Sequence, residues 1–321
     1  MTCEKKDVFA AILAGDGLSA EAARQFFSRL PATPRTWLPY AGIASSLGGA
    51  VPFTCGIVNA KSGLCQENCA FCAQSARHAA SPPVYSLVSP DILIRRAEAM
   101  AKAGIDYMGI VTSGTGPDER DFETICRTAE FISRNIGIRL CASLGILDEP
   151  QAKELSASGF TSCHHNLETS RSHYPRICTT HEYDLRAQTV LNAKKAGLRV
   201  CSGGIFGIGE TWEQRVEMAE ELARLEVDSI PVNFLVPVAG TPLAGAAPLP
   251  PGEALSIVSL FRLMHPKRDI VVCGGRANLG KYVPMLFAAG ANGLMVGDYL
   301  TVSGRPFAED MEMLTTLGLK S

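Results

Sequence analysis

From about residue 52 onward, the chain alternates between short β-branched runs and longer amphipathic stretches rich in Ala, Glu, Lys and Arg. Strands are predicted over roughly 52–58, 105–112, 138–144, 161–166, 199–205, 229–236, 269–273 and 293–297. Helices are predicted between them, at about 90–103, 122–135, 150–158, 183–196, 211–225 and 251–264. Strands separated by helices pair in parallel through right-handed crossovers. The pattern therefore favours an α/β fold, a (β/α)8 TIM-type barrel, with a doubly wound open sheet as the alternative.

The chain has 321 residues, a length that suits a single barrel. Residues 1–45 carry apolar side chains at helical spacing and are predicted to form an N-terminal helical extension. Residues 46–321 are assigned to the barrel, which ends in a closing helix after residue 299. The Pro- and Gly-rich stretch 237–252 is interpreted as one long loop rather than a linker.

Composition narrows the possible functions. The net charge is −2, and the 30 basic residues are scattered, so no nucleic-acid partner is indicated. The chain contains no apolar run long enough for a membrane span, and its N-terminus lacks the pattern of a signal peptide. A cytoplasmic location is therefore expected. In a cytosolic enzyme of this size, eleven cysteines indicate metal binding better than a disulfide framework.

Three of the cysteines lie close together in a C-x3-C-x2-C motif, Cys65, Cys69 and Cys72. The motif follows the first predicted strand, and thiolates are soft ligands that suit iron–sulfur clusters. Three protein ligands leave one iron of a [4Fe–4S] cluster open for a substrate or cofactor. A structural zinc site, with His78 as the fourth ligand, is the alternative.

This loop resembles that of the radical S-adenosylmethionine (SAM) superfamily, and residues 40–320 resemble the biotin synthase family within it. The matching segments are CQENCAFCAQSARH, CHHNLETS, YPRICTTHEYDLR, KKAGLRVCSGGIFGIGET, SIPVNFLVPVAGTPL and AGANGLMVGDYLTVSG. The resemblance implies a (β/α)8 barrel that holds a [4Fe–4S] cluster. It also implies that SAM is the radical source and that dethiobiotin is converted to biotin by sulfur insertion.

Further polar side chains and thiols occur at the ends of predicted strands, where the active site of a barrel lies. They are Cys141, Asn166, Glu168, Cys201, Asn233, Cys273 and Arg276. Any one of the cysteines alone could be a small buried apolar residue. Their shared position at one end of the barrel predicts a common site.

The resemblance implies a second cluster inside the barrel, [2Fe–2S] or a variant type, that donates the sulfur atom. Its ligands in the family are three cysteines and one arginine, and Cys141, Cys201 and Arg276 match three of these positions. The fourth position is Gly109, which cannot bind iron. Three explanations remain open: Cys273 replaces the missing ligand, the second cluster binds weakly, or the enzyme acts on another substrate.

Other cysteines bear on that ligand set. Cys163 is a second candidate for the missing ligand, although strand alternation leaves the direction of its side chain undecided. Cys3, Cys55, Cys126 and Cys178 are expected to be structural.

The resemblance also assigns contacts to the cofactor and the substrate. Arg186 is expected to bind the SAM carboxylate, Glu168 the ribose, and Phe71 to lie near the adenine. Thr112, with Ser113 and Gly114, is expected to approach SAM through the backbone. Two amides, Asn166 and Asn233, are predicted to bind the ureido ring of dethiobiotin, because an amide matches both its N–H and C=O groups.

Biotin synthesis is therefore the predicted activity. The resemblance further implies a flavodoxin or ferredoxin as electron donor and a homodimer. A related radical SAM enzyme of the hydrogenase-maturation type, acting on another small molecule, is the alternative that Gly109 supports. A non-catalytic iron–sulfur carrier or zinc-binding protein is a third possibility.

Overall fold

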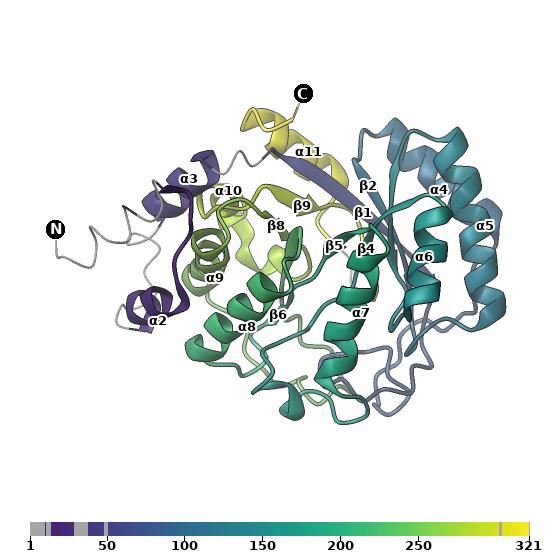
Figure 1. Ribbon diagram of the computed structural model, residues 1–321, viewed down its shortest axis with the longest axis horizontal. Helices are drawn as coiled ribbons and strands as arrows, with labels where there is room; N and C mark the ends of the chain where they lie inside the picture. Colours follow the sequence, from purple (N-terminus) through teal and green to yellow (C-terminus); the bar gives the residue numbers. More distant parts are fainter. Residues whose placement is uncertain (1–9, 11–13, 29–37, 48–50, 302–303, 321) are drawn as a thin grey trace.

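A computed structural model describes residues 10, 14–28, 38–47, 51–301 and 304–320 (Figure 1). Its strands are β1 Phe53–Lys61, β2 Tyr107–Thr112, β3 Arg139–Ser143, β4 Phe160–His164, β5 Arg199–Cys201, β6 Gly204–Phe206, β7 Ser229–Phe234, β8 Asp269–Val272 and β9 Gly293–Met295. They form one sheet in the order β5-β4-β3-β2-β1-β9-β8-β7-β6, and β5 also pairs with β7. This last pairing closes the sheet. The predicted barrel is confirmed, and the open doubly wound sheet is wrong.

The six predicted helices are confirmed, with small differences at their ends. They are α4 Pro90–Lys102, α5 Glu119–Asn135, α6 Glu149–Ala157, α7 Tyr183–Lys195, α8 Trp212–Arg224 and α9 Pro251–Met264. A short helix, α10 Met285–Ala288, connects β8 to β9. Three of the helices begin at side-chain caps: Asp118, Asp148 and Thr211 each accept a hydrogen bond from a backbone N–H of the first turn.

The predicted strand 199–205 is divided into β5 and β6, which both pair with β7. The division lies opposite Pro231, which has no N–H to donate to the ladder. At Gly203 the backbone passes so close that a Cβ atom would lie 2.0 Å from the Pro231 carbonyl oxygen. The two short strands therefore occupy one strand position of the barrel. The break between them lies where Pro231 interrupts the hydrogen bonds of β7.

Two N-terminal helices, α2 Ala20–Ser28 and α3 Leu38–Leu47, lie on the outside of the barrel beside α8 and α9 (Figure 1). Phe26 and Phe27 of α2 pack with Val216, Leu260 and Leu263 in a small apolar cluster. Residues 1–9, 11–13 and 29–37 of the predicted 1–45 extension lie outside the described residues. The C-terminal helix α11 Phe307–Thr316 falls within the predicted closing segment. No helix among the described residues is both long and apolar enough to cross a membrane.

Side chains of β1 alternate between the two faces of the barrel wall. Thr54, Val58 and Ala60 are buried on the side of the helices. Phe53 and Ile57, on the opposite face, line the cavity inside the barrel. Because this period of two holds along the strand, Cys55 also faces the cavity.

Candidate active site

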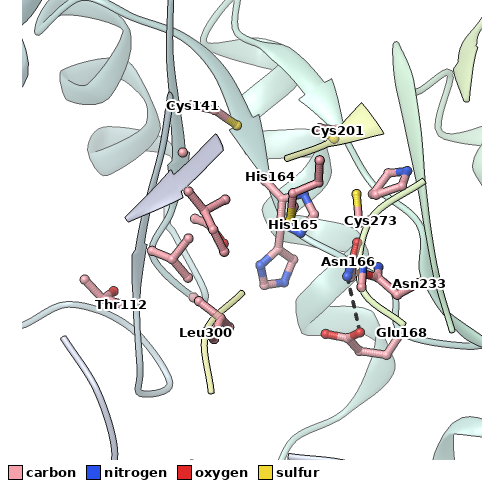
Figure 2. Close-up of a pocket in the computed structure, with 18 of the residues that line it drawn as sticks. Thr112, Cys141, His164, His165, Asn166, Glu168, Cys201, Asn233, Cys273 and Leu300 are labelled. Carbon is pink, nitrogen blue, oxygen red and sulfur yellow. Dashed lines mark hydrogen bonds between the residues drawn. The ribbon is translucent and has the colours of Figure 1, made fainter. Parts of the chain in front are cut away.

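One cavity of about 430 Å³ occupies the interior of the barrel and extends to the loops after the strands. Twelve of the thirteen predicted site residues line it: Cys65, Cys69, Phe71, Cys72, Thr112, Cys141, Asn166, Glu168, Arg186, Cys201, Asn233 and Cys273. The thirteenth, Arg276, is not among its lining residues. Figure 2 shows Asn166, Asn233 and Glu168 gathered near Cys273. The structure therefore brings nearly all of the predicted site residues to a single space.

The cysteine loop follows β1 and folds back on itself. The Cys65 N–H donates to the Gln74 carbonyl oxygen at 3.1 Å, and the Ala76 N–H donates to the Cys65 oxygen at 2.7 Å. The Cys72 N–H donates to the Cys69 oxygen at 2.9 Å, which forms a tight turn between the second and third cysteines. All three thiols line the same cavity. Burial raises the pKa of Cys72 to about 11.

His78 does not join these thiols as the zinc alternative requires. Its Nε2 lies 3.0 Å from the Cys69 backbone oxygen. A different group, which sequence reasoning missed, does approach them: the ligand atoms of Cys69, Cys178 and His181 all lie within 4.8 Å of one another. This group shares one cysteine with the motif, so a metal ion held there would compete with a cluster held by Cys65, Cys69 and Cys72.

His181 connects the cysteine loop to the other side of the cavity. Its Nδ1 lies 2.7 Å from the Glu67 carboxylate, and its Nε2 lies 2.8 Å from the Tyr174 hydroxyl. The same hydroxyl accepts a hydrogen bond from Arg186 Nε at 2.9 Å. Glu67 lies between the first two cysteines of the motif. The network therefore fixes the position of Arg186 relative to the loop.

Arg186 and Glu168 form a buried ion pair at one wall of the cavity. Arg186 Nη1 donates to Glu168 Oε1 at 3.3 Å and to the Asn166 backbone oxygen at 3.0 Å. Burial raises the pKa of Glu168, and the guanidinium opposes that rise. Burial lowers the pKa of Arg186, but Glu168, Tyr174 and Cys69 together outweigh it, and the net shift of the pKa is upward. The Arg186 guanidinium and the Glu168 carboxylate therefore face the cavity together. A guanidinium suits the carboxylate of a zwitterionic ligand, and a carboxylate can accept hydrogen bonds from a diol.

Glu168 also has an unusual backbone. Its φ of +70° lies in the left-handed region, which costs about 1–2 kcal/mol for a residue with a side chain. Two hydrogen bonds hold it there: its N–H donates to the Gly203 oxygen at 3.2 Å, and Ile205 N–H donates to its own oxygen at 2.8 Å. Such strain persists where the surrounding structure enforces it, often at functional sites. Here it directs the carboxylate toward Arg186.

The two predicted amides, Asn166 and Asn233, each bond to the backbone. Asn233 Nδ2 donates to the Gly204 oxygen at 3.1 Å, and its Oδ1 accepts from Gly274 N–H at 3.0 Å. Asn166 Oδ1 accepts from Gly203 N–H at 3.2 Å, and its Nδ2 donates to Glu168 at 3.4 Å, the dashed line in Figure 2. An amide has two donor hydrogens and two acceptor sites. One of each therefore remains available on both residues.

Four thiols line the cavity inside the barrel: the predicted Cys141, Cys201 and Cys273, and also Cys55. Burial raises the pKa of Cys141 to about 12, and burial also raises the pKa of Cys201. The expectation that Cys55 is structural did not foresee its place in this cavity. Cys163, in contrast, packs in the core behind β4 and is not a lining residue.

The sequence matches two family models, Radical SAM superfamily over residues 61–222 and Biotin and Thiamin Synthesis associated domain over residues 231–320. Biotin synthase from Nitratidesulfovibrio vulgaris (strain Miyazaki F) is 54% identical over 287 residues, which cover 86% of this chain and 79% of that protein. The chain belongs to the biotin synthase family. Biotin synthase from Geobacter sulfurreducens is 52% identical and covers 83% of this chain, with 81% of its own length matched.

Two solved structures share the fold of this biotin synthase family member. Methylornithine synthase superposes with a TM-score of 0.83 at 19% identity, covering 98% of this chain and 96% of its own. The FeFe-hydrogenase maturase from Carboxydothermus hydrogenoformans gives 0.82 at 16% identity, covering 98% and 79%. At these identities the likeness shows the barrel alone. The sequence relationship to biotin synthases favours that family over the hydrogenase-maturation alternative.

The position at which the biotin synthase family resemblance implies a third cysteine is Gly109 on β2. Gly109 lines the cavity and pairs in register with Ile57 of β1 and Cys141 of β3. A Cβ atom added there would lie 3.0 Å from Ile57 Cγ2. Part of the space for a side chain at this position is therefore taken by Ile57.

Arg276, the remaining predicted ligand, lies outside that cavity. Its Nη1 donates to Asp310 Oδ1 at 2.8 Å, its Nη2 donates to the other carboxylate oxygen, and its Nε and Nη2 donate to the Met295 oxygen. The residue is fully buried. Gly275, with φ of +76°, turns the chain just before it. The side chain fastens the helix α11 to the barrel.

We expect Arg186→Lys to weaken SAM binding by about 10-fold or more, because it keeps the charge but removes the planar guanidinium, and a hydrogen bond to a charged group contributes about 1.5–3 kcal/mol. Equilibrium binding of SAM to anaerobically reconstituted protein measures this. Arg171→Lys is the matched control, since Arg171 pairs with Asp184 at a half-exposed site away from the cavity. Equal SAM affinities for the two variants would contradict the assignment.

Proposed function

We propose that this chain is a biotin synthase that inserts sulfur into dethiobiotin through SAM-dependent radical chemistry. One observation carries the proposal: a single cavity is lined by the three loop cysteines, the Arg186–Glu168 pair, two side-chain amides and a further group of thiols. The amides, Asn166 and Asn233, each keep a donor and an acceptor that are not used within the protein. Generation of a radical, binding of a cyclic urea and delivery of sulfur each need one of these parts. The family membership supports the same activity.

The loop cysteines suit a [4Fe–4S] cluster because three soft ligands at the mouth of the cavity leave room for a ligand on the fourth iron. When bound, this cluster supplies the electron that cleaves SAM into a 5′-deoxyadenosyl radical. Arg186 orients the SAM carboxylate, and Glu168 accepts hydrogen bonds from the ribose. Phe71 lies against the adenine, and Thr112 contacts SAM through its backbone.

Asn166 and Asn233 orient dethiobiotin. Each amide keeps one donor and one acceptor for the ureido ring after its bonds to the backbone are counted. A substrate without a cyclic urea would leave these buried groups unpaired, and the binding site would discriminate strongly against it. This pair supports a substrate of the dethiobiotin class over another small molecule.

The buried thiols suit the auxiliary cluster, [2Fe–2S] or a variant type, that supplies sulfur when it is bound. Cys141, Cys201 and Cys273 face the same space from three different strands or strand ends. They are the soft ligands that iron–sulfur clusters need. Recruitment of Cys273 therefore remains the proposed answer to the glycine at position 109.

Three expectations remain. An electron donor of the flavodoxin or ferredoxin type and a homodimer rest on the family resemblance, and a location in the cytoplasm rests on the sequence. Size-exclusion chromatography of the reconstituted protein tests the second, and SAM cleavage with each reduced donor in turn tests the first.

Reduced, anaerobically reconstituted protein given SAM and dethiobiotin tests the proposed activity. We expect 5′-deoxyadenosine and biotin, both quantified by liquid chromatography with mass spectrometry. Deoxyadenosine formed without biotin or a thiolated intermediate would show that the chain acts on another substrate. A protein that binds iron but never cleaves SAM would be a carrier.

The Cys69, Cys178 and His181 group yields a separate prediction. If the motif holds a cluster, Cys178→Ser should leave the loop cluster and SAM cleavage intact, because Cys178 is not one of the three motif cysteines. If the group instead holds zinc, the same variant should lose the metal, since zinc sites need their full ligand set. Metal analysis and the visible absorption spectrum of reconstituted protein distinguish the two, with Cys126→Ser, a buried core thiol, as control.

A further inference from the structure

We propose that Cys55 is a fourth ligand of the barrel cluster, in an all-thiolate set with Cys141, Cys201 and Cys273, and that Arg276 is not a ligand. This inference deepens the proposed function, since it names the residues that would hold the sulfur-donating group. The evidence is the convergence of four side chains in one cavity and the separate use of the arginine.

Cys55 is placed for this role by β1. It is the third residue of that strand and shares the inward face with Phe53 and Ile57. Its Sγ lies 3.9 Å from the Leu294 oxygen of β9, and Met295, the residue that pairs with it in register on β9, also lines the cavity. Cys55 therefore faces the cavity from β1, beside β9.

The other thiols surround it. Cys141 comes from β3, Cys201 from the end of β5, and Cys273 follows β8 directly. All four thiols line the same cavity. Four thiolates are a complete ligand set for either a [2Fe–2S] or a [4Fe–4S] cluster. No additional nitrogen ligand is needed.

The wall between β1 and β3 explains why the set includes β1 rather than β2. Gly109 of β2 offers no side chain, and Ile57 of β1 occupies part of the adjoining space. Cys55 stands two residues before Ile57 on the same face. The ligand lost at position 109 is thus replaced by a thiol on the neighbouring strand, nearer the amino end of the barrel.

Arg276 already donates hydrogen bonds to groups other than the cavity thiols. Four of the five N–H bonds of its guanidinium go to Asp310 and the Met295 oxygen. It is fully buried in that arrangement. Binding to a cluster in the cavity would require it to give up a two-point ion pair with a fully buried carboxylate, which would then keep only its contact with Arg305 at 3.2 Å.

The experiment isolates the barrel cluster in the full-length chain. In a background of Cys65→Ala, Cys69→Ala and Cys72→Ala, iron bound after anaerobic reconstitution belongs to the barrel. Cys55→Ala or the near-isosteric Cys55→Ser is added to this background, and Arg276→Lys or Cys126→Ala separately. Iron and sulfide per chain and the Mössbauer spectrum are measured, and circular dichroism of each metal-free protein monitors folding.

We expect Cys55→Ala to lose most of the barrel iron, and Cys55→Ser to retain iron with an altered spectrum. Arg276→Lys and Cys126→Ala should keep the spectrum of the background. The proposal is overturned if a folded Cys55→Ala protein keeps the iron content and spectrum of the background, if Arg276→Lys alters that spectrum, or if the background binds no iron.

Failure of this inference and failure of the proposed function are separable. If wild-type protein makes biotin while Cys55→Ala keeps the background spectrum, only the ligand assignment is wrong. If the four thiols hold a cluster but wild-type protein makes no biotin, the ligand assignment stands and the activity is wrong. The two readouts, spectrum and product, are measured on the same preparations.

Discussion

Changing Cys65 to alanine is expected to abolish SAM cleavage. Cys65 is one of three thiols that face the mouth of the cavity, and its backbone anchors both ends of the loop through Gln74 and Ala76. A cluster that keeps a site open for SAM has no spare protein ligand to lose. Dithionite-reduced protein with SAM should therefore produce 5′-deoxyadenosine in the wild type and none in Cys65→Ala, as quantified by chromatography.

Cys126→Ala is the matched control for this prediction. Cys126 is a buried thiol of α5 that packs in the core and does not line the cavity. Removing it tests the general effect of losing a cysteine without touching the site. Deoxyadenosine production by Cys65→Ala at the wild-type rate would show that this loop is not the site of radical formation. If the wild type produced none either, the chain would be a metal carrier.

The barrel could be predicted from sequence because its pattern is repeated many times. Each strand predicted from a β-branched run is present, and six amphipathic stretches are helices with ends close to those expected. The exception, at 199–205, depends on a distant residue. Pro231 interrupts the hydrogen-bond ladder from the partner strand, and its effect on residues 202–203 appears only when β7 is placed beside them.

Much of the site could also be foreseen, since parallel strands end at the same edge and bring their following residues together. The place of Cys55 in the cavity could not be foreseen. The strands of a parallel barrel are buried on both faces, so their sequences do not reveal which face is inward. A single cysteine in such a strand resembles a small apolar core residue. One signal was available: alternation along β1 places Phe53, Cys55 and Ile57 on one face.

Arg276 is the reverse case, a residue that the sequence predicts to be a ligand but whose side chain is paired elsewhere. It follows a strand at the catalytic end of the barrel, where the sequence suggests a side chain pointing inward. Its partner Asp310 is 34 residues further along the chain, on α11. Nothing near Arg276 in the sequence indicates that pairing. The turn at Gly275 and the position of α11 together decide where the guanidinium lies.

The contacts of Arg276 lead to a large expected loss of stability. Arg276→Met should lower the free energy of unfolding by about 3–5 kcal/mol, because it removes the buried partner of a buried carboxylate and leaves Asp310 with only the contact to Arg305. Arg276 and Asp310 are both fully buried. The urea midpoint of the metal-free protein, followed by circular dichroism, measures the loss without any contribution from a cluster. Arg134→Met, which removes an exposed helical pair with Glu130, should cost less than about 1 kcal/mol.

A double variant separates the ion pair from the packing around it. Replacing both partners, as Arg276→Met with Asp310→Leu, removes the unpaired charge and should recover much of the stability, since apolar replacements of a buried pair are often tolerated. Arg305, which also contacts Asp310, remains in place and loses that contact in the double variant. If Arg276→Met is as stable as the wild type, the arginine does not depend on Asp310. It would then be free to reach the cavity, and its exclusion from the cluster ligands would be wrong.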